Sequence, residues 1–502
     1  MVSAEKGLPD SFDPKTGWNI RWVAKLGTQS YSTPVVAGGR VYIGTNNGEP
    51  RDPKHQGDRG VLMCFEEKTG NFLWQLVVPK REEDPYFDWP MTGMSSPATV
   101  EGNPGEGSGA GRVYLVSNRG EVLCLDARGM ADGNDGPFLD EAAHMTPPTN
   151  SGALPKYVIG AEISPEPLRP PADGKLLEPG PTDADILWVF DLVAEAGIWP
   201  HDGAHSSILI HGNYLYLNTG TGVDNTHKRI RTPDAPSLIV LDKRTGRLVA
   251  RDDEHIAPNI FHGTWSAPSF GKVGVRPLIF FCGGNGVVYA FETVQNHPRP
   301  GEVMKLKKVF QFDFDPAGPK TDVHKFNSNR REGPSNIYGM PVFHRDRLYV
   351  AGGGDIWWGK NEAWLKCIDA TKTGDITTNG LIWSYPLEKH VMSTPAVHDD
   401  LVFIADCGRT FHCVAAKTGK PYWTAEIKGE VWASPYVADG KVYLGTRSGD
   451  FYVFAASKEK KLLASIELGD PISATTTAAN GVLYVATMRN LYALQAGAGP
   501  KQ

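Results

Sequence analysis

Residues 392–423, MSTPAVHDDLVFIADCGRTFHCVAAKTGKPYW, contain the pattern that decides the fold. Small residues and a proline lead into a β-prone run, and an Asp-Asp turn separates this run from the next. A third run ends in Lys-Thr-Gly and is followed by a segment with tryptophan. Alternating β-branched and aromatic residues between such turns are typical of short antiparallel strands. The unit therefore predicts one small sheet.

The same unit recurs along the whole chain. The next copy is WASPYVADGKVYLGTRSGDFYVFAASKEKKLLAS at 432–465, and the first begins with YSTPVVAGGRVYIGT at 31–45. We recognise eight copies, and short strands repeating at this spacing are typical of β-propeller blades. Four copies also place a cysteine at one strand position, which indicates a small buried packing residue.

The ends of the chain complete the last copy. The eighth unit, 473–494, stops after its third strand, and NIRWVAKL at 19–26 supplies a fourth strand with Trp22. Other copies carry tryptophan at this position, which we expect to dock neighbouring blades. We therefore predict an all-β, eight-bladed propeller in which strand 19–26 closes the ring and leaves no open edge. The propeller occupies 19–498 as one domain, with tails at 1–18 and 499–502.

Composition excludes several classes of protein. The chain has 502 residues and a formal net charge of −6, which does not suggest a nucleic-acid partner. It has no apolar run of 18 residues, so we expect no membrane span. The first ten residues, MVSAEKGLPD, show no signal peptide. Cys407 and Cys413 flank a tight turn, which leaves a disulfide between them open.

Loop lengths differ between the two faces of the predicted ring. The connections between second and third strands, and those between blades, share one face, here called the top. Long top loops gather around the first five units and leave the last three bare, which predicts a walled cleft. Segment 128–184 joins a third to a fourth strand, so we expect it on the bottom face as an extended arm.

The first residues of the innermost strands are predicted to surround the mouth of the central channel. They are Tyr31, Met94, His205, Trp265, Tyr338, Met392, Trp432 and Ser473. This ring is either a filling of the channel or a stacking platform for a flat or sugar-like ligand. Tyr31, Trp265 and Trp432 are its candidates for stacking on a ligand or cofactor.

Histidines concentrate in the top-face segments. His201, His205, His262 and His390 are candidate ligands for a divalent ion such as Ca²⁺, Zn²⁺ or Mn²⁺. Alternatively, His205 is a catalytic base oriented by Asp202. A third interpretation is that these are ordinary loop histidines.

Basic and phenolic residues suggest a further chemistry. Arg330 and Arg331 lie in a top insertion and are suited to clamp a carboxylate. With His205 or Tyr338 as the base, they would serve a polysaccharide lyase, although no motif supports that activity.

The repeated tryptophan, the Thr-Gly turn and the Ser-Thr-Pro-Val start resemble the PQQ-like propeller superfamily, where PQQ is pyrroloquinoline quinone. This superfamily includes quinoprotein alcohol dehydrogenases and a non-catalytic lipoprotein scaffold of outer-membrane assembly. The resemblance implies a PQQ-stacking role for Trp265 and a metal-binding role for Asn285, in Gly263-Thr264-Trp265 and Cys282-Gly283-Gly284-Asn285. The chain lacks the adjacent cysteine pair and the cytochrome motif found in many members.

These observations lead to one main functional prediction and two alternatives. We expect a top-face cleft that binds a small sugar-like or alcohol ligand, in an enzyme of quinoprotein-like or metal-dependent type. The alternatives are a non-catalytic scaffold and a polysaccharide lyase. The resemblance alone implies a periplasmic or secreted protein.

Overall fold

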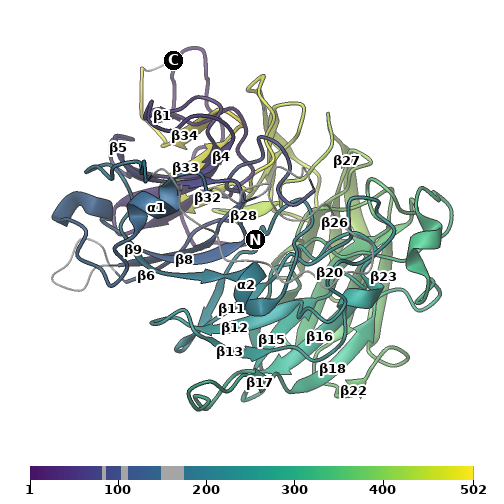
Figure 1. Ribbon diagram of the computed structural model, residues 1–502. Coiled ribbons are helices and arrows are strands. Elements are labelled where there is room, and N and C mark those ends of the chain that lie inside the picture. The colour runs from purple at the N-terminus through teal and green to yellow at the C-terminus, as the bar shows by residue number, and fades with distance from the viewer. Residues whose placement is uncertain (82–85, 103–110, 149–173, 501–502) are drawn as a thin grey trace.

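The computed structural model describes residues 1–81, 86–102, 111–148 and 174–500, and it is built almost entirely from β-strands. Eight antiparallel sheets stand around a common axis, and in Figure 1 the colour runs once around the ring from purple to yellow. The predicted eight-bladed propeller is therefore confirmed. In the described residues, no helix combines the length and apolar character needed to cross a membrane.

The first four blades include two extra short strands, β17 and β22, which pair in parallel with the outer edges of blades 3 and 4. Blades 1 and 2 contain β2 (Val35–Ala37), β3 (Arg40–Asn46), β4 (Arg59–Glu66), β5 (Phe72–Pro79), β6 (Thr99–Glu101), β7 (Arg112–Val116), β8 (Glu121–Asp126) and β9 (Ile186–Asp191). Blades 3 and 4 contain β10 (Leu209–His211), β11 (Tyr214–Asn218), β12 (Leu238–Asp242), β13 (Leu248–Arg251), β17 (Met304–Lys305), β14 (Ser269–Val273), β15 (Arg276–Cys282), β16 (Val287–Glu292), β18 (Lys308–Asp313) and β22 (Gly374–Asp375).

The last four blades have four strands each. Blades 5 and 6 contain β19 (Val342–His344), β20 (Arg347–Gly353), β21 (Ala363–Asp369), β23 (Leu381–Leu387), β24 (Ala396–His398), β25 (Leu401–Ala405), β26 (Thr410–Ala415) and β27 (Pro421–Glu426). Blades 7 and 8 contain β28 (Tyr436–Ala438), β29 (Lys441–Gly445), β30 (Asp450–Ala455), β31 (Leu462–Glu467), β32 (Thr477–Ala479), β33 (Val482–Ala486), β34 (Asn490–Leu494) and β1 (Ile20–Lys25).

Strand burial follows position in the blade. The second and third strands are buried along nearly their whole length, as β25 and β26 show, because neighbouring blades cover both faces. The outer strand β27 instead alternates exposed and buried residues. Hydrophobic contacts between blades therefore form a core that runs around the ring, in place of a single central core.

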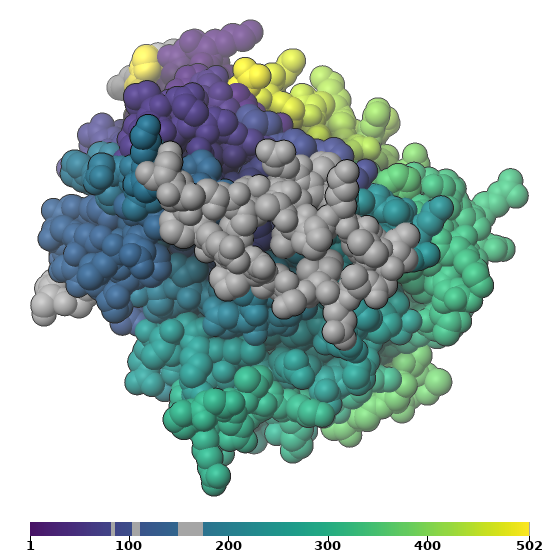
Figure 2. Space-filling view, in the orientation of Figure 1, coloured from purple at the N-terminus to yellow at the C-terminus, as the bar shows by residue number. Residues whose placement is uncertain are grey.

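Blade 8 is closed by the two ends of the chain. Strand β1 pairs antiparallel with β34, with Trp22 opposite Ala493. Purple and yellow atoms consequently lie side by side in Figure 2. Residues 1–18, expected as a tail, pack against the propeller: Leu8 and Phe12 are buried in the core of blades 7 and 8.

The predicted docking role of the repeated tryptophans is visible in their hydrogen bonds. Each indole donates to a backbone carbonyl in the next blade, as Trp22 does to Glu67 and Trp188 to Lys243. The repeated cysteines lie opposite these tryptophans, with Cys124 facing Trp188 and Cys413 facing Trp423. All six cysteines are buried and free, so the disulfide left open between Cys407 and Cys413 does not form.

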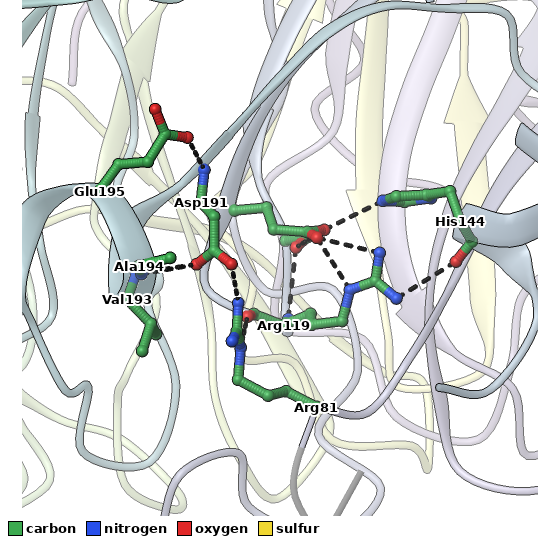
Figure 3. Close-up of polar contacts among 9 residues, drawn as sticks. Arg81, Arg119, His144, Asp191, Val193, Ala194 and Glu195 are labelled. Atoms are coloured by element: carbon green, nitrogen blue, oxygen red, sulfur yellow. Dashed lines mark hydrogen bonds and ion pairs between the residues drawn. The ribbon is translucent and has the colours of Figure 1, made fainter. Parts of the chain in front are cut away.

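Segment 128–184 joins β8 to β9, and its residues 149–173 lie outside the described residues. It begins with the 3₁₀ helix η1 (Gly129–Asp132), and α1 (Glu141–Met145) follows. His144 on α1 contacts Glu121, next to the top turn between β7 and β8. Figure 3 shows the hydrogen bond that Arg119, in the same turn, donates to the carbonyl of His144. The described part of the segment therefore reaches the top end of blade 2 and is not confined to the bottom face.

Three more short helices lie in top-face connections. They are α2 (Leu192–Ala196), η2 (Ala257–Asn259) and η3 (Val323–Phe326). Asp191 caps α2 by accepting hydrogen bonds from the amides of Val193 and Ala194, and Arg81 binds its other carboxylate oxygen (Figure 3). These contacts fix the beginning of the loop that carries His201.

Candidate functional site

A cavity of about 290 Å³ lies where the innermost strands begin. It is lined by Tyr31, Thr92, Ser95, Asp202, His205, Trp265, Tyr338, Trp357, Met392, Trp432 and Ser473. Seven of the eight residues expected to form the channel ring are among them, whereas Met94 is fully buried elsewhere. The ring leaves open space between its side chains, so it does not fill the channel at this level.

Aromatic rings form the walls of the cavity. Trp265 lies 5.2 Å from Tyr338, and Tyr31 stacks on Trp432 at 6.3 Å, as measured between ring centroids. Trp357 extends from the loop between β20 and β21 and contacts Trp265 at 5.9 Å and Trp432 at 6.0 Å. The cavity thus offers flat apolar surfaces on several sides, an arrangement suited to stacking against a small ring.

Three buried histidines form a cluster beside this cavity. One ring nitrogen from each of His201, His227 and His262 lies within 4.8 Å of those of the other two. His262 contacts the cavity residues Trp265 and Trp357, with ring centroids 5.0 and 5.4 Å apart. The cluster and the cavity therefore share a wall.

A buried carboxylate connects the cluster to the cavity. Asp355 is fully buried, and its Oδ2 accepts a hydrogen bond of 2.8 Å from Nδ1 of His262. The hydroxyl of Tyr338 donates to the same oxygen, while the amides of Trp357 and Trp358 donate to Oδ1 at 2.9 and 2.6 Å. This one side chain positions His262, Tyr338 and the loop that carries Trp357.

Electrostatics keep these groups in defined states. Burial, together with the neighbouring histidines, holds the pKa of His201 well below its usual value and lowers that of His227 to about 4. Burial would raise the pKa of Asp355, but its contact with His262 and the hydrogen bonds that it accepts from Tyr338 and the Trp358 amide outweigh burial, so the pKa is lowered. Burial and the Asp355 charge raise the pKa of Tyr338 well above its usual value. Tyr338 therefore keeps its proton and donates a hydrogen bond to Asp355.

The structure brings together two of the four expected metal ligands. His201 and His262 belong to the cluster, and His227 takes the place expected for His205 and His390. The imidazole of His205 contacts the backbone carbonyl of Asp202 at 2.7 Å, and His390 contacts that of Lys360 at 3.0 Å. These two histidines occupy separate positions because their rings point at backbone oxygens.

The structure also differs from the expected pairing of the His205 imidazole with the Asp202 carboxylate. Both residues line the cavity, but Asp202 orients His205 through its backbone oxygen. Its carboxylate instead faces His201, with Oδ1 3.7 Å from Nε2. Asp202 takes this position with a positive φ of 58°, a conformation that Asp tolerates better than most residues.

Three other candidates lie away from the cavity. Arg330 donates to the carbonyls of Ile356, Trp357 and Gly359, so it holds the Trp357 loop and is not a carboxylate clamp. Arg331 is exposed and does not line the cavity. Asn285 donates to the hydroxyl of Tyr289 within its own turn and also lies outside the lining. For Arg330 and Asn285, local hydrogen bonding overrides the role that their residue type suggested.

Sequence reasoning missed His227, Asp355, Trp357 and Arg447 as site residues. His227 and Asp355 lie in two of the long top-face loops, 220–236 and 354–363. The length of these loops was the one feature of the sequence that could have indicated them as site residues. Arg447 stacks over Trp432 at 3.8 Å and donates to Ser473, which places a cation at the edge of the cavity. No local pattern marks this arginine, because its turn is one of the short ones.

Comparison with known proteins supports the architecture. Residues 361–499 match the PQQ repeat family described as outer membrane protein assembly factor BamB. The structure resembles BamB from Moraxella catarrhalis with a TM-score of 0.52 at 12% identity, covering 96% of this chain and 99% of that one. The chain is a β-propeller, and its last part matches the PQQ repeat family. The computationally designed Ika8 protein resembles it with a TM-score of 0.50 at 11% identity, covering 93% and 96% of the two chains.

A curated relative of this chain is lupanine 17-hydroxylase [cytochrome c] from a Pseudomonas species. The two sequences are 23% identical over 436 residues. The match covers 83% of this chain and 52% of the relative, so the chain spans about half the relative's length.

The residues of this propeller do not fit PQQ with a calcium ion. PQQ is a flat, carboxylate-rich quinone, yet the charged residue in the cavity lining is the acid Asp202, and Arg447 is one cation at the edge. Asn285, the residue suggested as a calcium ligand, lies outside the lining. Cys282 is a buried thiol without an adjacent cysteine to stack on the cofactor. The aromatic walls remain suited to an uncharged ring.

Proposed function

We propose that this protein is an enzyme that binds a small sugar-like or alcohol ligand in the aromatic cavity and acts on it with the adjoining histidine cluster. The observation that carries the proposal is the open cavity of about 290 Å³, lined by residues that lie just before the innermost strands of all eight blades. Apolar rings with a few directed polar groups are typical of small-molecule sites. Tryptophan and tyrosine faces suit the C–H faces of a sugar ring.

Two further groups, in the cavity lining itself, are placed to act on such a ligand together with the histidine cluster. Because Nε2 of His205 contacts the carbonyl oxygen of Asp202, it carries the proton, and Nδ1 retains a lone pair for a base. The Asp202 carboxylate lies between the cavity and His201. We infer a metal-dependent reaction in preference to a quinone-dependent one, since the donor set does not fit PQQ.

The similarity to an outer-membrane assembly factor supports a periplasmic location as part of this proposal. The structural similarity to BamB does not favour the scaffold alternative, because a resemblance at 12% identity concerns the fold and not the function.

Ligand binding tests the proposal directly. We would titrate the protein with neutral mono- and disaccharides, polyols and short alcohols, following tryptophan fluorescence and calorimetric heat. Trp265→Ala and Trp432→Ala should weaken binding at least tenfold, because each removes a cavity wall. Tyr422→Ala, at an exposed aromatic on β27, is the matched control and should leave binding unchanged.

Two results would contradict this function. One is an absence of binding by every compound in the panel. The other is binding that Trp265→Ala and Trp432→Ala leave intact, which would place the ligand elsewhere on the molecule. Selective capture of an unfolded outer-membrane polypeptide, without binding of small ligands, would support the scaffold alternative instead.

A further inference from the structure

The three clustered histidines come from three loops that are tied together by backbone contacts. His201 precedes β10, His227 lies between β11 and β12, and His262 precedes β14. The amide of His201 donates to Gly220, and the carbonyl of His262 accepts from Val223 at 2.9 Å. These bonds join both inter-blade loops to the His227 loop, so the three side chains are held together before any ligand binds.

A glycine permits this close approach. A Cβ atom on Gly222 would lie 2.5 Å from the carbonyl oxygen of His262 and 2.6 Å from Cβ of His201. Any larger residue would push the loops apart, and the three imidazoles would then separate.

The hydrogen bonds of two histidines fix which nitrogen is available. Nδ1 of His201 lies 2.8 Å from the carbonyl oxygen of Val223, and Nδ1 of His262 lies 2.8 Å from the Asp355 carboxylate. Both partners accept hydrogen bonds, so each Nδ1 carries the proton and each Nε2 a lone pair. Both Nε2 atoms are buried without a hydrogen-bond partner. Two buried lone pairs therefore lack the partner that such groups require.

We propose that His201, His227 and His262 bind one divalent transition-metal ion of the zinc class, with a coordination position open toward Asp202 and the cavity. Neutral imidazoles suit zinc, whereas calcium prefers oxygen ligands. A ligating histidine that donates its other N–H to a carboxylate or carbonyl is the usual outer support of such sites. Three protein ligands with one open position are typical of catalytic zinc.

The geometry requires a small adjustment. The three nitrogens lie within 4.8 Å of one another, while ligands of tetrahedral zinc are roughly 3.3 Å apart. Rotation of the side chains that shifts the ring nitrogens by about one ångström closes this difference. This inference rests on the proposed function in so far as it assigns the metal for that reaction. The binding of the metal ion is argued from the histidine cluster alone.

A second group of potential ligands, Asp52, His55 and Asp183, does not support the same inference. Nζ of Lys54 lies 2.5 Å from Asp183 and 3.5 Å from Asp52, so a cation of the chain already neutralises these carboxylates.

Calorimetry with metal-free full-length protein tests the site. ZnCl₂ should bind with a stoichiometry of one, and excess CaCl₂ should not compete. His262→Ala and His227→Gln should each weaken zinc binding at least 100-fold, and Asp355→Asn should weaken it 10- to 100-fold. His390→Ala, a buried histidine outside the cluster, is the matched control and should bind zinc as the unaltered protein does.

Cobalt substitution provides a readout independent of activity. Co²⁺ bound by three imidazoles should give the visible absorption of a four- or five-coordinate ion, and this band should disappear in His227→Gln. Circular dichroism would verify that each variant is folded. A lack of stoichiometric Zn²⁺ binding would overturn the proposal, as would equal affinity in the unaltered protein and His227→Gln. Zinc binding without sugar or alcohol binding would contradict the proposed function while leaving the metal site intact.

Discussion

At the scale of single residues, blade 2 contains a buried ion network that anchors α1. The Glu121 carboxylate accepts hydrogen bonds from Arg119 at 2.9 Å and contacts Nε2 of His144 at 3.0 Å. Arg119 also donates to the carbonyl of His144. All three side chains are nearly inaccessible to solvent. Removing one partner from such a group leaves the others buried and unpaired.

The pH dependence of stability tests this network. Burial would raise the pKa of Glu121, but Arg119 and His144 outweigh it and lower the pKa below its usual value of 4.5. Glu121 therefore contributes stability that is fully present above pH 4.5 and is lost as pH falls further. Glu121→Gln should cost about 3–5 kcal/mol at pH 7. The cost should shrink progressively below pH 4.5, as measured by urea unfolding.

Glu426→Gln serves as the control for this prediction, because Glu426 is an exposed carboxylate on β27. It should change the free energy of unfolding by less than about 0.5 kcal/mol at any pH. A cost of Glu121→Gln that stayed constant down to pH 3 would show that the carboxylate charge is unimportant.

At the scale of secondary-structure elements, the Thr-Gly turn and the tryptophan form one contact between neighbouring blades. The indole of Trp188, on β9, packs against the turn after β12, where Gly246 has a φ of +72°. A Cβ at this position would lie 2.5 Å from the Trp188 ring. Gly70 and Gly419 meet Trp22 and Trp383 in the same way. The two features recur together because each glycine makes room for the preceding blade's indole.

Two alanine substitutions separate the backbone effect from the packing effect. Gly212→Ala and Gly246→Ala both place alanine at positive φ, of +60° and +72°, but only the second meets a neighbour within 4 Å. Gly212→Ala should cost about 1 kcal/mol for its backbone conformation. Gly246→Ala should cost roughly 1–3 kcal/mol more, because the indole must move. Chemical denaturation measures both, and equal costs would argue against the proposed packing role.

At the scale of the whole molecule, ring closure depends on a strand that no short turn connects to its blade. Strand β1 is held in its sheet by pairing with β34 and by the packing of the preceding residues, such as Leu8 and Phe12, against blades 7 and 8, while Trp22 donates to Glu67 in blade 1. Outer strands such as β27 follow directly from their own blades. Loss of β1 would expose the edge of β34, and unpaired edges favour association between molecules.

Proline substitutions at matched positions test this closure. Val23 and Thr424 are exposed residues that each follow the docking tryptophan, on β1 and β27 respectively. Val23→Pro should lower the melting temperature more than Thr424→Pro, because β1 can leave its blade. It should also produce oligomers in size-exclusion chromatography with light scattering, while Thr424→Pro stays unassociated. Equal melting temperatures and equal association of the two variants would mean that β1 is held in blade 8 as firmly as β27 is held in blade 6.

The local sequence determined the architecture. Strand alternation, turn residues and repeat spacing are properties of neighbouring residues, and they define the eight blades and the closing role of residues 19–26. The ring around the cavity was also predictable, because each member occupies the same position in its own repeat. Met94 is the exception, because it lies one residue further from its strand β6 than the other members do from theirs, and Ser95 takes the position that lines the cavity.

Only the tertiary structure decided which polar groups meet. His201, His227 and His262 converge because three loops from neighbouring blades bond to one another, and Asp355 reaches His262 across 93 residues of sequence. His390, Arg330 and Asn285 have the residue types of a site, yet nearby backbone or side-chain groups hold them elsewhere, and His205 lines the cavity without joining the cluster. A repeat specifies where loops begin and end, whereas the conformation of a long loop depends on contacts that sequence spacing does not encode.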